Sequence, residues 1–321
     1  MKLGFILGLC IALFGAHVFA AVALAKTRQL TKNKFFRLAF FLILNDAFMM
    51  IEYAWHTILM NTNDFYTDGP HQDQCLVLLH LIPASILSSL WMTFSMCLQR
   101  INATMVVSKR VLNILTSTIA IGLGFLFTHV YFLSRCVLEF IQKVQRVQFP
   151  CAPNYNTQKR FLMFMDTPNA LFVTCIACSY LVLILRIFRK RKPINGTKNL
   201  SELQIQRERK AALRTRHNMI TLSCIIIITA VSILPRTCYG LYVNFTGTID
   251  DDIVRATNNL LLLNPLVDPI IYIFRIKEVR CQLICRCRSN KTTPLGLPMQ
   301  SANATTSTSR TIVSGLATIT K

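Results

Sequence analysis

The sequence predicts an all-α membrane protein, a bundle of seven transmembrane helices followed by a short amphipathic eighth helix. Of its 321 residues, 53% are hydrophobic and only 15% are charged, whereas soluble domains carry about 25% charged residues. The apolar residues gather in seven blocks, each close to the length of about 20 residues that a helix needs to cross a bilayer. A helix also satisfies its backbone hydrogen bonds within its own segment, as lipid requires. This composition excludes most soluble enzymes.

The first block is the one most easily mistaken for a cleaved signal peptide, because Lys2 precedes it and small residues end it. It is longer than a usual signal-peptide core, and five basic residues follow it directly. We therefore expect a first span with almost no extracellular domain before it. The sixth span has a predicted helical lead-in at 200–217, opened by a capping box of Ser201 and Gln204. The expected spans are 3–25, 38–60, 75–98, 111–134, 165–188, 218–243 and 256–274.

Basic residues are distributed unevenly between the two sides of the expected bundle. The connections 26–37, 99–110 and 189–217, together with 275–321, carry 26 Lys and Arg, whereas the opposite side carries 7. Since cytoplasmic loops carry the excess of Lys and Arg, this predicts an extracellular amino terminus and a cytoplasmic carboxyl terminus in the plasma membrane. The net charge of +21 suits contact with anionic lipids. No nucleic-acid partner is expected, because the basic residues adjoin apolar blocks.

Two regions follow from this pattern, a seven-helix domain with its membrane-surface helix at 1–288 and a Ser/Thr-rich tail at 289–321. The tail has no apolar periodicity, so we expect it to be disordered and open to phosphorylation. Cys281, Cys285 and Cys287 follow the last span beside basic residues, which suits palmitoylation at the inner leaflet. The alternative is three free thiols.

Cys75 opens the third span on the outer side, where an oxidising exterior favours a disulfide. Its candidate partners are Cys151 in the second outer loop and Cys136. We prefer Cys151, because Cys136 belongs to the expected end of the fourth helix.

Asp268-Pro269-Ile270-Ile271-Tyr272 closes the seventh span, Cys75 stands 25 residues before Arg100, and Asp46 lies in the second span. With the seven spans, these features resemble the rhodopsin-like G-protein-coupled receptors over residues 1–288. The resemblance implies a partner G protein, with Arg100 and Tyr272 at the coupling surface. It also implies that an arrestin and a receptor kinase act on the tail.

In that family, the positions of Asp46, Ser89, Asn264 and Asp268 line a hydrated pocket that holds a sodium ion, which is the one cofactor the resemblance implies. Independently of the resemblance, a charged side chain inside a span is a functional hypothesis by default, because lipid makes it costly. The alternative is that these groups only join helices by hydrogen bonds.

The sequence departs from the family where Arg100 stands in the triplet Gln99-Arg100-Ile101, without the usual acidic neighbour. This loss of an ion pair predicts elevated basal signalling. The sixth span keeps the kink proline, Pro235, but lacks the tryptophan that precedes it in the family.

Four residues are candidates for a ligand pocket: Glu52, His56, Ile82 and Arg236. The family's amine receptors place an aspartate where Ile82 stands, so an amine ligand is not expected. Leu262 replaces the lysine that opsins use for retinal. Arg236 needs an anion or water at its depth, and the anion is either a protein carboxylate such as Glu52 or an acidic group on a ligand. The expected ligand is extracellular, either a small acid, a lipid or a peptide.

The alternative function is a multi-span ion or solute transporter that uses Asp46, Glu52, Arg236 and Asp268 as its path. Such proteins often contain inverted repeats, and none is detectable in this sequence. Phosphate loops, HExxH and nucleophile elbows are missing as well, so no enzymatic activity and no enzyme cofactor are expected.

Overall fold

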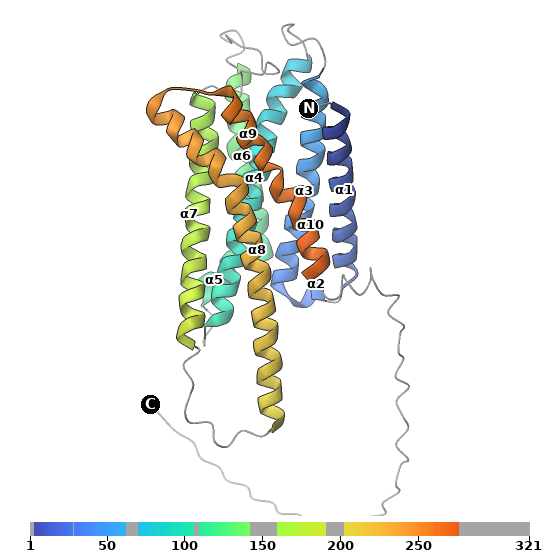
Figure 1. The fold of residues 1–321 in the computed structure, drawn as a ribbon, viewed down its shortest axis with the longest axis vertical. Helices are drawn as coiled ribbons and strands as arrows, with labels where there is room; N and C mark the ends of the chain where they lie inside the picture. The colour runs from blue at the N-terminus through green and yellow to red at the C-terminus, as the bar shows by residue number, and fades with distance from the viewer. Residues whose placement is uncertain are drawn as a thin grey trace, which may run out of the picture. The chain divides into compact units, whose positions relative to one another are not determined.

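The computed structural model describes residues 3–27, 29–61, 70–105, 109–141, 159–190 and 202–275. Within these ranges every regular element is an α-helix (Figure 1). Five helices are long and apolar enough to cross a membrane: Gly4–Ala25, His71–Thr104, Thr118–Ile141, Met163–Ile187 and Leu222–Thr246. The all-helical membrane fold is therefore confirmed, whereas the count of seven spans stays a prediction.

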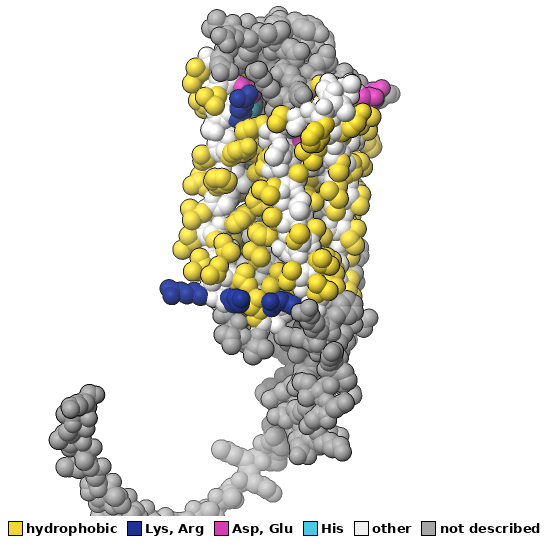
Figure 2. All heavy atoms as spheres, turned by 90° about the vertical axis from the view of Figure 1, so that its left-hand side faces the viewer, with side chains coloured by type: hydrophobic (Ala, Val, Ile, Leu, Met, Phe, Trp, Pro, Cys, Tyr) yellow, Lys and Arg dark blue, Asp and Glu magenta, His cyan; other side chains and the backbone are white. Residues whose placement is uncertain are grey.

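The outer surface of these helices is too apolar for contact with water. Large hydrophobic side chains such as Phe127, Leu171 and Ile227 are more than half exposed, and an apolar band covers the face in Figure 2. Lys and Arg side chains gather at one end of that band. An exposed apolar surface of this extent marks a lipid contact, so the protein is embedded in a membrane and crosses it several times.

Helix α1 (Leu3–Ala25) has the predicted bounds. After the short α2 (Gln29–Lys32), α3 (Lys34–Leu59) covers the expected second span. Asn33 begins α3 as its N-cap, because its side chain accepts a hydrogen bond of 3.0 Å from the Phe35 N–H. The helix is long enough to span a membrane, although its interior holds the buried carboxyl groups of Asp46 and Glu52.

The long helix α4 (Pro70–Thr104) contacts α3, α6 (Thr118–Ile141) and α7 (Lys159–Lys190). The expected fourth span at 111–134 starts later, because the chain first forms α5 (Arg110–Leu115) and breaks at Thr116. Ser117 then begins α6, since its hydroxyl accepts a hydrogen bond of 3.2 Å from the Ala120 N–H.

Helix α8 (Glu202–Thr246) contains the sixth span and the expected helical lead-in from residue 202 onward, so the lead-in is confirmed, whereas Ser201 of the predicted capping box lies outside the described residues. The expected seventh span is divided into α9 (Asp251–Leu261) and α10 (Leu263–Arg275). Pro265 explains the break, because it has no N–H to donate to the carbonyl of Leu261 four residues earlier. Helix α10 contacts α1, α3 and α8, and thereby closes the bundle (Figure 1).

Several predictions lie outside the described residues. They concern the amphipathic helix after residue 275, the tail at 289–321, Cys151, and the palmitoylation candidates Cys281, Cys285 and Cys287.

Candidate functional site

The centre of the bundle holds two carboxyl groups that face each other, Asp46 from α3 and Asp268 from α10. Both side chains are completely buried, and they lie close enough together for their charges to interact. The Ser89 hydroxyl of α4 donates a hydrogen bond of 3.3 Å to Asp46 Oδ1. Two buried carboxyl groups in contact need a proton or a cation between them. Three of the four predicted switch residues therefore meet directly.

The fourth, Asn264, lies beside them and accepts a hydrogen bond of 3.0 Å from the Thr229 hydroxyl of α8 through its Oδ1. A cavity of about 10 Å³ is lined by Asp46, Ser89 and Asn264 together with apolar neighbours. Such a volume is about that of one water-sized sphere. The structure therefore brings together the four polar residues that were predicted to lie in one cluster.

This cluster fits a sodium ion chemically. Asp46 Oδ2 and both carboxylate oxygens of Asp268 are buried without a hydrogen-bond partner, and oxygen donors of this kind suit hard cations. In the described residues, no group of three or more His, Cys, Asp or Glu side chains forms a metal site. The donors here are two carboxylates, a hydroxyl and an amide.

The sequence interpretation missed His17, which is completely buried in α1 beside this cluster. Its Nε2 donates a hydrogen bond of 2.8 Å to the carbonyl of Pro265. That carbonyl lacks its usual helical donor, because Pro269 stands four residues later without an N–H. His17 is close enough to Asp46 for their charges to interact. A lone histidine in an otherwise apolar span was the signal available.

Glu52 does not meet Arg236. Its Oε2 accepts a hydrogen bond of 2.9 Å from the Ser85 hydroxyl, while Asn45 donates one of 2.9 Å to the carbonyl of Ser85. The alternative of an internal Arg236–Glu52 pair is therefore wrong. Glu52 instead joins α3 to α4, and it is not among the described residues that line the ligand cavity.

The carboxylate next to Arg236 belongs to Asp166 of α7. Arg236 Nε lies 3.6 Å from Asp166 Oδ1, and each side chain is only 1% exposed. This distance makes an ion pair but is too long for a hydrogen bond. Gly240, one turn after Arg236, leaves room for the carboxyl group, because a Cβ there would overlap Asp166. Asp166 was missed because it lies at the very edge of its expected span.

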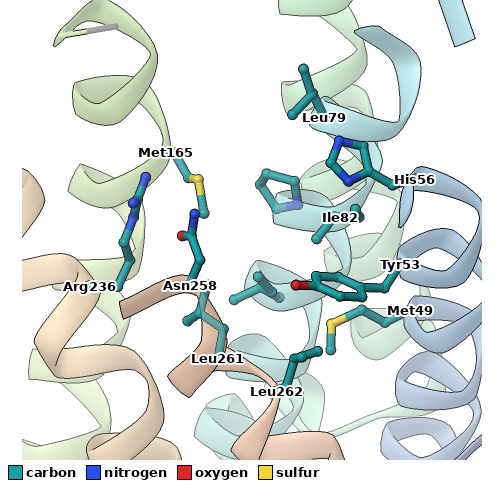
Figure 3. A pocket seen from close by; sticks show the side chains of 12 residues that line it. Met49, Tyr53, His56, Leu79, Ile82, Met165, Arg236, Asn258, Leu261 and Leu262 are labelled. Carbon is teal, nitrogen blue, oxygen red and sulfur yellow. The ribbon is translucent and has the colours of Figure 1, made fainter. Parts of the chain in front are cut away.

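Three of the four ligand candidates, His56, Ile82 and Arg236, line one cavity of about 100 Å³. Figure 3 shows Arg236 and Met165 on one side and His56 and Tyr53 on the other. The remaining wall is mostly apolar and consists of Met49, Leu79, Pro83, Ile86, Asn258, Leu261 and Leu262.

The ligand cavity and the small cavity of the polar cluster are neighbours. Met49, Ile86 and Leu261 line both of them. A molecule that moves one of these three side chains would therefore also change the space around Asp46.

Arg100, near the end of α4, has an aromatic partner. Its guanidinium carbon lies 4.0 Å from the centre of the Phe35 ring of α3, while Nε and Nη2 are buried without a hydrogen-bond partner. No carboxylate pairs with Arg100 in the described part of the chain. The helical position of Tyr272 is described, but its side chain is not.

Cys75 is completely buried and forms a disulfide bond. Cys136 lies inside α6, as predicted, and is not disulfide-bonded. Cys136 is therefore not the partner, and because Cys151 lies outside the described residues, the pairing of Cys75 with Cys151 stays a prediction.

No protein-family model matches the chain, and a comparison with curated proteins found no similar one.

Proposed function

We propose that the chain is a rhodopsin-like G-protein-coupled receptor that converts the binding of an extracellular ligand into activation of a heterotrimeric G protein. The observation that carries this proposal is the shared wall between the ligand cavity and the buried Asp46–Asp268 cluster. A bundle whose buried polar groups only joined helices by hydrogen bonds would not need a cavity of about 100 Å³ that shares part of its wall with them.

The proposed mechanism begins when a ligand enters the cavity lined by α3, α4, α7, α8 and α9. Contact with Met49 or Leu261 moves the wall of the smaller cavity and changes how well it holds a cation or water against Asp46. A ligand acts through its different affinity for two states. The state in which the cluster is rearranged is the one that binds the G protein.

At the other end of α4, Arg100 is the group that the resemblance assigns to coupling. In the resting state it stacks on Phe35, and a cation–π contact is worth about 0.5 to 2 kcal/mol. Because no carboxylate in the described part of the chain pairs with Arg100, a modest free-energy change releases it. This supports the expected elevated basal activity.

The orientation follows from the excess of basic residues on one side, with the amino terminus extracellular and the carboxyl terminus in the cytoplasm of the plasma membrane. Anionic lipids contact the basic segments. An arrestin and a receptor kinase act on the tail, as they do in the family.

The test compares basal second-messenger levels in cells that report several G-protein classes. Arg100→Ala should lower the ligand-free signal, while Phe35→Leu, which removes the stacking partner, should raise it. Phe36→Leu is the matched control, since Phe36 is the adjacent aromatic residue of α3. Equal signals from wild type and Arg100→Ala at equal surface expression would contradict basal coupling. Ion or solute flux in reconstituted vesicles would favour the transporter instead.

A further inference from the structure

We propose that the ligand cavity accepts an uncharged, largely apolar molecule with one hydrogen-bond acceptor, such as a carbonyl oxygen, that binds Arg236. This deepens the proposed function, because the molecule would be the agonist of the receptor. It also argues against one of the three expected ligand classes, the small acid.

The shape and lining of the cavity support the apolar body of such a ligand. Most of the described lining residues are aliphatic or sulfur-containing, among them Met49, Leu79, Ile82 and Met165. Ligand cavities usually combine such a lining with a few polar groups that fix the orientation of the molecule.

Two polar side chains that line the cavity, Arg236 and His56, have buried nitrogen atoms without a hydrogen-bond partner, and the Arg236 guanidinium can act only as a donor. Arg236 is 1% exposed, and its Nη1 is buried without a hydrogen-bond partner. His56 Nε2 is also buried and unpaired, and the Tyr53 hydroxyl points into the cavity (Figure 3). A buried donor without a partner costs free energy, so an acceptor on the ligand would remove that cost.

The charge balance around the cavity favours a neutral acceptor over an acidic group on the ligand. Arg236 is the only Lys, Arg, Asp or Glu among the described lining residues, and Asp166 already balances its charge at 3.6 Å. A ligand carboxylate would leave one uncompensated negative charge in the bundle, and the cost of burying an unpaired ion is several kcal/mol. A carbonyl group needs only the donors.

An ammonium group is disfavoured for a related reason. Asp166 is enclosed between Arg236 and the bare face of α8 at Gly240, and it is not among the described lining residues. A cationic ligand would meet the Arg236 guanidinium without an acidic partner within reach. The structure therefore assigns the cavity to uncharged molecules.

The experiment measures saturable binding of four probes to the full-length protein in nanodiscs at neutral pH. The probes share an octyl-length chain and are methyl octanoate, 2-octanone, octanoate and octylamine. Wild type should bind the ester and the ketone at least about tenfold more tightly than either charged probe, because each charged probe would bury an uncompensated ion at a cost of several kcal/mol. Tighter binding of octanoate or octylamine, or no saturable binding of the uncharged probes, would overturn the proposal.

Asp166→Asn supplies the decisive comparison, because it leaves the Arg236 charge uncompensated at nearly constant volume. We expect its affinity for octanoate to rise about tenfold or more, with little change for methyl octanoate. An unchanged octanoate affinity in the folded variant would overturn the charge argument.

Should the single variant fail to fold, Asp166→Asn combined with Arg236→Met keeps the test, because it buries no charge at this site and leaves no donor at position 236. It should bind the uncharged probes about tenfold more weakly than wild type, and undiminished binding would overturn the role of Arg236. Binding without G-protein activation would contradict the proposed function but leave the ligand class intact. Activation by octanoate in preference to the ester would contradict the ligand class alone.

Discussion

Removing either member of the Arg236–Asp166 pair alone should destabilise the bundle far more than removing both. The charged atoms are 3.6 Å apart and each side chain is 1% exposed. At an effective dielectric constant of about 20, their attraction is about 4 to 5 kcal/mol. Arg236→Met leaves a buried carboxylate and Asp166→Asn leaves a buried guanidinium, so each single variant should lose about 3 to 5 kcal/mol.

The double variant carries neither charge. Its stability should be within about 1 to 2 kcal/mol of wild type, because an apolar or neutral pair of similar volume replaces a buried ion pair at little cost. The measurement is thermal denaturation of purified wild type, both single variants and the double variant in one detergent. Together they form a double-mutant cycle, which isolates the coupling between the two side chains.

Gly240→Ala perturbs the same pair without removing a charge, because the new Cβ would overlap the Asp166 carboxyl group. We expect a loss of about 1 to 3 kcal/mol. Gly15→Ala is its control, since a Cβ there meets no atom within 4 Å.

If the losses of the Arg236→Met and Asp166→Asn variants simply add in the double variant, the pair is not coupled and the explanation given for the burial of Asp166 is wrong.

Two further predictions concern packing and the polar cluster. Gly124→Ala should destabilise the protein by about 1 to 3 kcal/mol, because its Cβ would overlap the Trp91 indole, whereas Gly122→Ala, which meets nothing, should be neutral or stabilising in the same thermal assay. Sodium chloride should stabilise wild type relative to choline chloride by about 1.4 kcal/mol at a tenfold excess of sodium over its dissociation constant. Asp268→Asn should abolish that difference, and an equal sodium effect in both proteins would place the ion elsewhere.

The sequence predicted the helices well where a local signal set their limits. The apolar run of α1 gave the right bounds, and the helical lead-in of α8 was recognised from its pattern. It was less successful where a single side chain or a proline decides the boundary. Ser117 delays α6 and Pro265 divides the seventh block, and neither effect changes the hydropathy on which the prediction depended.

The candidate site was predicted in part for the same reason. Asp46, Ser89, Asn264 and Asp268 were grouped correctly, since charged and polar groups in lipid must converge on one another. The partner of Arg236 was not found, because helix periodicity gives the face of one helix but not which neighbour it meets. The sequence alone does not distinguish Asp166 from Glu52 as the carboxylate partner of Arg236. Only the packing of α7 against α8 selects Asp166.

The amino-acid sequence alone therefore determined that this chain lies in a membrane as a set of helices. Whether a segment enters lipid depends on its own length and apolarity, and not on any other segment. Only the tertiary structure decided which buried charges are already compensated, since that depends on distances of a few ångströms between helices remote in the chain. That distinction narrows the expected ligand from a small acid, a lipid or a peptide to the uncharged acceptor that we propose.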